Sequence, residues 1–354
     1  MLLIMGFGVL VRKVCIAFGH AECGLAQQFR HVAWDGLHLE DTIFPLFLFI
    51  AGVSFAFSCA RRLQGGATRA SIAVNVLRRA VLLFVIGLVY NGMLKKGPAD
   101  TVWMSVLGRI GLAWALAALI RLYLPLRGRM AVAFVILLAY WMFMRFVGAP
   151  DHPGAFPLSP EGNFSGYLDR LLLPGRLTVP GLYSNQGLLS TLPAVVTALL
   201  GIFAGDYLRS SSDTGGRKAA TLAIAAAILA AAGLLVAFGC GPYSMPLNKI
   251  LWSTSFVLVV GGYSTALLAL FYWIIDVKGC SGWTTFFRVI GMNAIAIYVA
   301  QAVISFSAIS NFFLGWAAGF CSEAWAAVVL QAGYVAACWL FLWFLDRRGI
   351  YLKV

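Results

Sequence analysis

The sequence predicts an all-α, polytopic membrane protein, a single-domain bundle of about ten transmembrane helices spanning residues 1–354. Hydrophobic residues make up 61% of the chain and charged residues only 11%, whereas about a quarter of the residues in a soluble domain are charged. Apolar runs of roughly 17 to 25 residues recur along the whole length, and each is long enough to cross a hydrocarbon core of about 30 Å as a helix. Strand-like alternation of polar and apolar residues is absent, so closed helices are the structure expected to satisfy the backbone.

The first apolar run, residues 1–11, would span only about 17 Å as a helix. We interpret it as the latter part of a retained first span. A signal peptide is the competing interpretation, but no basic region precedes the run and no small-residue cleavage site follows it. Nine further spans are predicted at residues 43–60, 80–94, 103–122, 130–148, 187–208, 219–238, 250–275, 286–306 and 323–345.

Two connections are long, residues 20–42 and residues 149–186. Within the second, residues 166–173 predict a short amphipathic helix that lies on the exoplasmic surface of the membrane, with Tyr167 and three leucines as anchors.

Basic residues gather in alternate loops, which predicts the orientation. The loops predicted to be cytoplasmic contain Arg61, Arg62, Arg78, Arg79, Arg127, Arg129, Arg217, Lys218, Arg347, Arg348 and Lys353. By the positive-inside rule, both termini are expected in the cytoplasm and the loop carrying His31 on the exoplasmic side. The net charge of +13 therefore indicates topology, and we expect no nucleic-acid partner. The seven cysteines form no C-x-x-C pair and have no metal spacing with the four histidines, so we expect no bound metal and no disulfide framework.

The stretch from Phe29 to Pro45 carries the most chemistry. If the chain from His31 to Asp35 is helical, His31, Trp34, Asp35 and His38 share one face. An imidazole, an indole and a carboxylate then converge as a proton-transfer site requires. The alternative is an interfacial helix whose Trp34 sits at headgroup level.

Four further polar residues lie in or beside predicted spans. Arg109 is an intramembrane arginine, which is either functional or snorkels to the outer interface. Asn293 needs a partner for its amide, either another helix or a ligand. Asn248 and Lys249 enter a span from outside and either hold a polar substrate or anchor the helix end.

On the predicted inner side, Lys278 and Arg288 lie where cytosolic phosphates reach. A basic inner loop is also what topology alone requires. The sequence has no phosphate-binding glycine loop, no Ser-His-Asp order and no HExxH.

Several strings together resemble the heparan-α-glucosaminide N-acetyltransferase family and its bacterial relatives. In family order they are His31-x-x-Trp34-Asp35-Gly36, Asp41-x-x-Phe44-Pro45, Gly166-Tyr167-x-Asp169-Arg170, Asn248-Lys249-x-Leu251-Trp252-Ser253, Asp276-Val277-Lys278-Gly279 and Gly291-Met292-Asn293. One departure is Ser184-Asn185-Gln186-Gly187, where the lysosomal enzyme has an acidic Asp-Pro-Glu-Gly. The role of those acids therefore does not transfer to this chain.

The resemblance implies an enzyme that takes an acetyl group from cytosolic acetyl-CoA and delivers it to an amino sugar across the membrane. The family's active-site histidine falls on His31, which acts either as a base for direct transfer or as a covalent acetyl carrier.

We therefore expect an acetyl-CoA-dependent N-acetyltransferase of the bacterial inner membrane. Its partners are an amino-sugar or glycan acceptor and the lipid bilayer, with a homodimer left open. We assign the catalytic role to His31 and to Asp35, which at i+4 would orient the ring. Substrate binding is assigned to Trp34, Asp41, Asn248 and Lys249, and binding of the acetyl donor to Arg109, Lys278, Arg288 and Asn293.

Two rival functions remain. One is a transporter or flippase for a polar sugar or lipid-linked solute, in which His31 and Arg109 line the pathway. The other is a catalytically inactive scaffold.

Overall fold

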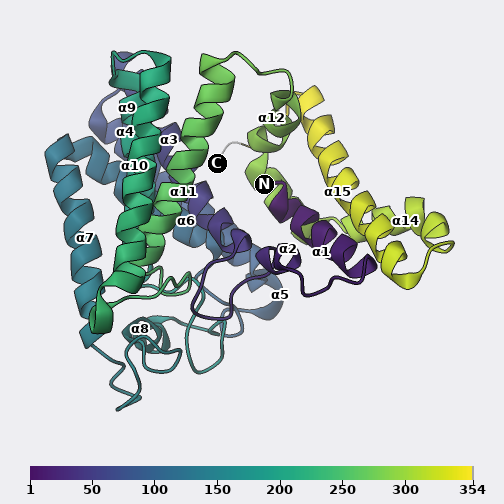
Figure 1. Ribbon diagram of the computed structural model, residues 1–354, viewed down its shortest axis with the longest axis horizontal. Helices are drawn as coiled ribbons and strands as arrows, with labels where there is room; N and C mark the ends of the chain where they lie inside the picture. Colours follow the sequence, from purple (N-terminus) through teal and green to yellow (C-terminus); the bar gives the residue numbers. More distant parts are fainter. Residues whose placement is uncertain (353–354) are drawn as a thin grey trace. The chain divides into compact units, whose positions relative to one another are not determined.

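A computed structural model describes residues 1–352, so Lys353, one of the bases predicted to be cytoplasmic, lies outside the described residues. Within them the chain is helical, with loops and isolated bridges but no extended strand (Figure 1). Eight helices in this described part are long and apolar enough to cross a membrane. They are α3 (Leu39–Gln64), α4 (Arg69–Tyr90), α6 (Val106–Tyr123), α7 (Leu126–Phe146), α9 (Thr191–Ser210), α10 (Gly215–Leu234) with its π-helical extension to Gly239, α11 (Thr254–Tyr272) with its extension to Val277, and α15 (Glu323–Arg347). The chain is therefore an integral membrane protein with a polytopic helical bundle, as predicted.

The remaining helices are shorter. They are a π-helical turn (Leu3–Phe7) followed by α1 (Gly8–Ala17), α2 (Gly24–Gln28), α5 (Met93–Lys96), α8 (Phe164–Leu172), a 3₁₀ turn (Gly241–Tyr243), α12 (Thr284–Met292), α13 (Ala294–Val303) and α14 (Phe306–Ala318). Helix α8 confirms the short helix predicted in the second long loop, where the side chain of Asn163 caps it by accepting from the backbone N–H of Gly166.

The predicted span 286–306 is not one continuous helix. It forms α12 and α13, which are bent by 65° at Asn293, and counting the pair as one span gives nine in the described chain. The backbone of Asn293 leaves the helical region at φ −124°, ψ 37°. Asn293 is the N-cap residue of α13, and its carbonyl accepts from the N–H of Ile297 at 3.1 Å.

Contacts group the chain into two compact units. Unit 1 consists of Met1–Val32, His38–Ile43 and the chain from Cys280 onward, and unit 2 consists of Ala33–Leu37 and Phe44–Gly279. The stretch that contains His31 therefore contributes to both units. A single domain over the whole chain stays a prediction.

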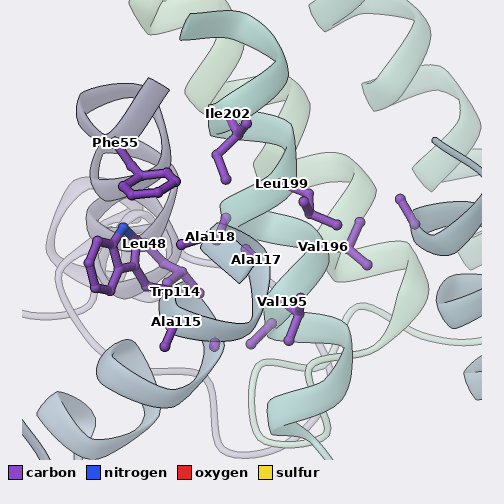
Figure 2. Close-up of a cluster of buried hydrophobic side chains, with 14 of the residues drawn as sticks. Leu48, Phe55, Trp114, Ala115, Ala117, Ala118, Val195, Val196, Leu199 and Ile202 are labelled. Carbon is purple, nitrogen blue, oxygen red and sulfur yellow. The ribbon is translucent and has the colours of Figure 1, made fainter. Parts of the chain in front are cut away.

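The largest core cluster of unit 2 contains residues of α3, α4, α6, α7, α9 and α11, and Figure 2 labels those of α3, α6 and α9. The cluster includes alanines of α6 and valines of α9, and the rings of Phe55 and Trp114 meet edge to face at 5.5 Å. Gly201 lets the backbones of α3 and α9 approach closely, because a Cβ on Gly201 would overlap the carbonyl of Phe49. Small residues at a helix interface are the usual means of packing helices inside a membrane.

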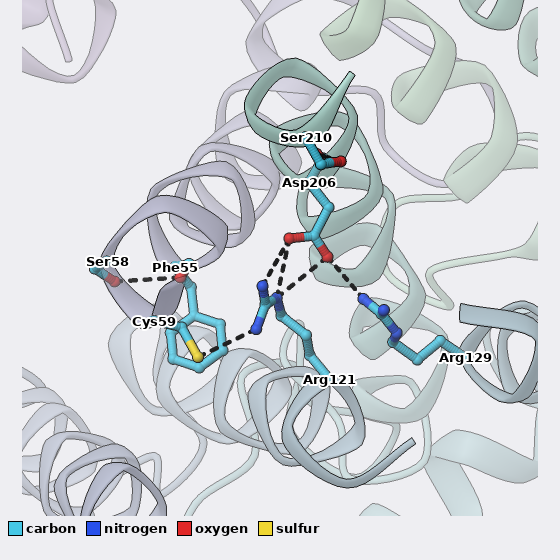
Figure 3. Close-up of polar contacts among 7 residues, drawn as sticks. All are labelled: Phe55, Ser58, Cys59, Arg121, Arg129, Asp206 and Ser210. Carbon is cyan, nitrogen blue, oxygen red and sulfur yellow. Dashed lines mark hydrogen bonds and ion pairs between the residues drawn. The ribbon is translucent and has the colours of Figure 1, made fainter. Parts of the chain in front are cut away.

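A charged cluster joins the ends of α6, α7 and α9 (Figure 3). Asp206 of α9 accepts hydrogen bonds from Arg121 of α6 and Arg129 of α7, each with a closest distance of 2.7 Å. Arg121 also donates to the sulfur of Cys59 in α3 at 3.1 Å. All three charged side chains are mostly buried, so the pairing removes much of the penalty for placing these charges within the bundle.

In unit 1, α15 packs along α14, α12 and the N-terminal helix. A second core cluster, built on residues such as Met5, Phe306, Cys338 and Leu342, holds these elements together.

Candidate active site

Residues 31–38 are not helical, so the predicted shared face of His31, Trp34, Asp35 and His38 is wrong. Other contacts of this segment explain the difference. Gly36 has φ 130°, and its N–H donates to the carbonyl of Leu247 at 2.8 Å, far along the chain. Because the N–H of Gly36 bonds to this distant carbonyl, it is not available for a helical hydrogen bond. The segment is irregular until α3 begins at Leu39.

In unit 1, the loop brings His31 onto the first turn of α3. Nδ1 of His31 lies 2.8 Å from Oδ1 of Asp41. The two partners differ sharply in exposure, because the side chain of His31 is 61% exposed and that of Asp41 only 2%. The result is a solvent-facing imidazole with a buried carboxylate behind it.

Asp41 is fixed by the backbone around it. Its Oδ2 accepts from the N–H groups of Val32 and His38, each at 3.3 Å. Asp41 is the third residue of α3, and its carboxylate accepts from the N–H of His38, the residue before the helix, as in a capping box. The negative charge of Asp41 is also favourable at a helix N-terminus. A carboxylate only accepts, so Nδ1 of a neutral His31 carries the proton and Nε2 the basic lone pair. Asp41, assigned from sequence to substrate binding, contacts the imidazole of His31 in the structure, and its role with substrate stays a prediction.

In unit 2, Asp35 is paired with Asn248. Nδ2 of Asn248 donates to Oδ1 of Asp35 at 3.1 Å, and Oδ1 of Asn248 accepts from the N–H of Leu251 at 2.8 Å. Partial burial raises the pKa of Asp35, and the hydrogen bond from Asn248 opposes part of that rise. The predicted i+4 geometry, in which Asp35 holds the His31 ring, depended on a helix that does not form. Lys249 follows Asn248 and is half-buried.

Trp34 is held at both ends of its indole. Its Nε1 donates to the carbonyl of Leu158 at 2.9 Å, and its ring lies 5.0 Å from that of Tyr183 at a tilt of 51°. The side chain is therefore positioned by the protein before any ligand arrives.

Arg109 does not snorkel, because its side chain is completely buried in unit 2. Its Nη2 donates to the hydroxyl of Ser190 and to the carbonyl of Gly187. The guanidinium also lies over two aromatic rings, 5.1 Å from the centroid of Trp252 and 5.9 Å from that of Phe44.

Two nitrogens of Arg109, Nε and Nη1, are buried and meet no acceptor in the described part of the chain. Buried donors of a charged group are costly to leave unsatisfied. The geometry therefore suits a polar ligand group, or water, against this side of the guanidinium.

Asp169 of α8 was not predicted to be a site residue, although it belongs to the motif Gly166-Tyr167-x-Asp169-Arg170. It is 1% exposed, and its carboxylate accepts from the N–H groups of Leu188 at 2.9 Å and Ser184 at 3.2 Å. Burial raises the pKa of Asp169 to about 6, although these hydrogen bonds and the positive charges of Arg109 and Arg170 act in the opposite direction. The signal in the sequence was an acid beside the leucines of a short amphipathic helix.

The turn between Asp169 and Arg109 requires glycine at position 187. A Cβ there would lie 2.5 Å from Oδ2 of Asp169, while the carbonyl of Gly187 accepts from Arg109. One short loop thus contacts both buried charged groups.

Trp252 is the one non-glycine residue among those described with a positive φ, at 51°. It is fully buried, its Nε1 donates to the hydroxyl of Thr197 at 3.1 Å, and its ring packs edge to face on Phe44. Such backbone conformations are unfavourable for bulky residues and cluster at functional sites.

The residues predicted to bind the acetyl donor from the inner side have protein contacts of their own. Lys278 lies 5.2 Å from the ring of Trp273 in unit 2. In unit 1, Arg288 is 62% exposed and lies 3.7 Å from Asp346. Asn293 donates to the carbonyl of Ile350 at 3.0 Å and accepts from the N–H of Leu352 at 3.2 Å. The amide of Asn293 thus finds protein partners, and a role for these three residues in binding CoA stays a prediction.

Comparison with known proteins identifies similar sequences. The family model described as "Heparan-alpha-glucosaminide N-acetyltransferase, catalytic" matches residues 17–238. A heparan-alpha-glucosaminide N-acetyltransferase of Mus musculus is 28% identical over 344 residues, covering 83% of this chain and 52% of the mouse protein. The Homo sapiens protein of the same name is 29% identical over 344 residues, covering 83% and 51%. The chain thus spans about half the length of the curated relatives it matches.

Proposed function

The chain belongs to the heparan-α-glucosaminide N-acetyltransferase family, and we propose on that basis that it transfers an acetyl group from acetyl-CoA to the amine of a glucosamine-type sugar. The observation that carries this proposal is the pair formed by His31 and Asp41. An exposed imidazole backed by a buried carboxylate is the arrangement that a general base requires.

In the proposed reaction, the amine of the acceptor attacks the thioester carbonyl of acetyl-CoA. Nε2 of His31 takes the proton that the amine loses as the C–N bond forms. The C–S bond then breaks, and the imidazolium returns the proton to the departing thiolate of CoA. Asp41 stabilises the imidazolium and holds the ring in the tautomer that leaves Nε2 basic.

Arg109 is proposed to bind the acetyl donor. Its unsatisfied Nε and Nη1 suit the amide oxygens of the pantetheine arm, because a guanidinium offers several donors in a fixed plane. Lys278, Arg288 and Asn293 are assigned to the nucleotide end, where cations pair with phosphates. Trp34, Asn248 and Lys249 are assigned to the sugar, with the indole as a stacking surface.

The proposed setting is the bacterial inner membrane, with both termini in the cytoplasm and His31 on the periplasmic side. The asymmetry of Lys and Arg between alternate loops supports this orientation.

The test is acetyl transfer by the purified full chain in detergent, with radiolabelled acetyl-CoA and a panel of amino sugars. The His31→Ala variant is expected to lose about 100-fold or more of the rate, because a positioned base contributes about 10² to 10⁴. The matched control is His20→Ala, an exposed histidine of the same long loop, which should retain the wild-type rate. Either of two results would overturn the proposal. One is acetyl transfer by His31→Ala at the wild-type rate, and the other is a wild-type protein that acetylates none of the amino sugars in the panel.

A further inference from the structure

Two cysteines of unit 1 are neighbours, and neither the proposed reaction nor the family resemblance assigns them a role. Cys15 lies near the end of α1 and is buried, whereas Cys23 is half-buried in the turn that follows. Their thiol groups lie within hydrogen-bonding range of each other. Two thiols at this range are the arrangement from which a disulfide bond forms.

The chain between the two cysteines folds back on itself through backbone hydrogen bonds. Gly19 has φ 78°, which lets the chain turn sharply after α1. The N–H of His20 then donates to the carbonyl of Cys15 at 2.8 Å, and the N–H of Cys23 donates to the carbonyl of His20 at 3.2 Å. The turn therefore brings Cys23 to the end of α1 without help from a covalent link.

Cys23 is the thiol suited to react first. It is the residue before α2, and its Sγ accepts from the N–H of Ala26 at 3.4 Å. This hydrogen bond lowers the pKa of the Cys23 thiol, and the thiolate is the form that attacks a disulfide. Because Cys23 is half-buried and Cys15 is buried, an incoming oxidant meets Cys23 before it meets Cys15.

The proposed orientation places this pair of thiols outside the cytoplasm. Cys23 belongs to the same long loop as His31, residues 20–42, which is assigned to the periplasmic side. The periplasm is an oxidising compartment in which disulfides form and persist, whereas thiols of cytosolic proteins are kept reduced.

The turn that carries Cys23 leads into the elements that hold His31. Helix α2 begins directly after Cys23, and at its end Oε1 of Gln28 accepts from the N–H of Leu39, the first residue of α3, at 3.1 Å. Asp41, in the same first turn of α3, contacts the imidazole of His31. A covalent link at Cys23 thus restrains the helix that supports the start of α3.

We propose that Cys15 and Cys23 form a disulfide bond in the periplasm, and that this bond fastens α2 to the end of α1. The inference rests on the proposed function only for the side of the membrane on which the two thiols lie. The cysteine spacing predicts no framework of several disulfides, and this single bond requires none.

The oxidant is a disulfide, either that of a dithiol oxidoreductase or that of a small molecule such as oxidised glutathione. The thiolate of Cys23 attacks one sulfur of the oxidant, so a mixed disulfide forms and one thiolate leaves. The thiol of Cys15 then loses its proton and attacks Sγ of Cys23, which forms the new bond and releases the second thiolate. The protein loses two electrons and two protons, and the oxidant becomes two thiols.

The test determines the state of both thiols by mass spectrometry. Cells that produce the full chain are dissolved directly in denaturant with N-ethylmaleimide, which blocks free thiols before air oxidises them. Trypsin cleaves after Lys13 and Arg30, so one peptide, residues 14–30, carries both cysteines. We expect this peptide to carry no maleimide and to be lighter by two hydrogen atoms than the same peptide after reduction.

The internal control is Cys321, an exposed cysteine that precedes α15. The proposed orientation places it on the same side of the membrane, and it should carry maleimide. Maleimide on both cysteines of peptide 14–30, or a bond from either of them to a different partner, would overturn the proposal.

A second measurement tests whether the bond fastens α2. Reductant should lower the melting temperature of the wild type in detergent by about 2 °C or more, because the bond restricts the unfolded chain. Cys23→Ser should melt like the reduced wild type and should not respond to reductant, whereas the matched variant Cys321→Ser should respond as the wild type does. Equal melting temperatures of the oxidised and reduced wild type would overturn the fastening role, and this comparison needs no substitution.

The mass of the peptide does not depend on acetyl transfer, so the two proposals can fail separately. A disulfide in a chain that acetylates no amino sugar supports the bond and counts against the proposed reaction. Acetyl transfer by a chain whose Cys15 and Cys23 are both free thiols overturns the bond alone.

Discussion

At the scale of single residues, the contacts of Asp41 and Asp35 differ from those expected from the sequence. Asp41 lies on His31 and is buried, while Asp35 pairs with Asn248. The spacing i+4 made Asp35 the natural choice for orienting the ring, but only if the segment were helical. His31 and Asp41 are ten residues apart, and this spacing predicts no contact in a helix. Only the folded loop shows that the carboxylate of Asp41 lies against the imidazole.

The first prediction separates these two acids. Asp41→Asn should lower the rate of acetyl transfer by about 100-fold or more, because the amide carries no charge to stabilise the imidazolium and no longer fixes its tautomer. Asp35→Asn should cost less than about tenfold, since the amide still meets Asn248. The measurement is kcat of both variants with one amino sugar. A larger loss in Asp35→Asn than in Asp41→Asn would contradict the assignment.

The second prediction concerns Arg109. Arg109→Lys keeps the positive charge but loses the planar fork, so its ammonium cannot occupy the positions of Nη2, Nε and Nη1 together. The KM for acetyl-CoA is expected to rise about tenfold or more, with a smaller change in the KM for the sugar. The control is Arg145→Lys, which lies in α7 and donates to the carbonyl of Pro242. An unchanged KM for acetyl-CoA in Arg109→Lys would remove Arg109 from donor binding.

At the scale of elements, α8 and the loop that follows it act as one piece. Asp169 in α8 accepts from two N–H groups of the loop 184–188, and Arg170 is paired with Asp151 on the preceding loop. The hydrogen bonds from Arg170 hold the pKa of Asp151 below its usual value, whereas burial raises that of Asp169. The two acids, Asp169 on α8 and Asp151 on the loop before it, thus have pKa values shifted in opposite directions.

The third prediction follows from the raised pKa of Asp169. Between its ordinary value of 3.8 and its folded value of about 6, the folded protein binds more protons at this residue than the unfolded protein does. The free energy of unfolding therefore falls as pH rises through that window. The melting temperature of the wild type minus that of Asp169→Asn should decrease from about pH 4 to about pH 7. A difference that grows over this range would show that the carboxylate is stabilised rather than penalised by its surroundings.

At the scale of the whole molecule, the fold was largely predictable because apolar runs and membrane thickness constrain helices strongly. The helix within the second long loop was also predictable from its amphipathic pattern. The break at Asn293 was not, since the partners of its amide are Ile350 and Leu352, more than fifty residues away. The burial of Arg109 was likewise hidden, because a position near the start of a span is compatible with either snorkelling or enclosure.

The fourth prediction separates the enzyme from a transporter of a polar solute. A ligand that binds only the folded state raises its stability, by about 2.7 kcal/mol at a concentration 100 times Kd. Millimolar acetyl-CoA should therefore raise the melting temperature of the full chain in detergent, and Arg109→Met should reduce that shift. No shift, together with uptake of a sugar into proteoliposomes, would favour transport.

The lack of room beside Gly187 has a consequence for how this sequence varies among its relatives. A methyl group at position 187 and a carboxylate at position 169 compete for one volume, so the two positions are not independent during evolution. Chains that keep an acid at 169 should keep glycine at 187, and a larger residue at 187 should occur only where 169 has become smaller. Sequencing such relatives would reveal the pair as a covarying couple without any measurement of activity.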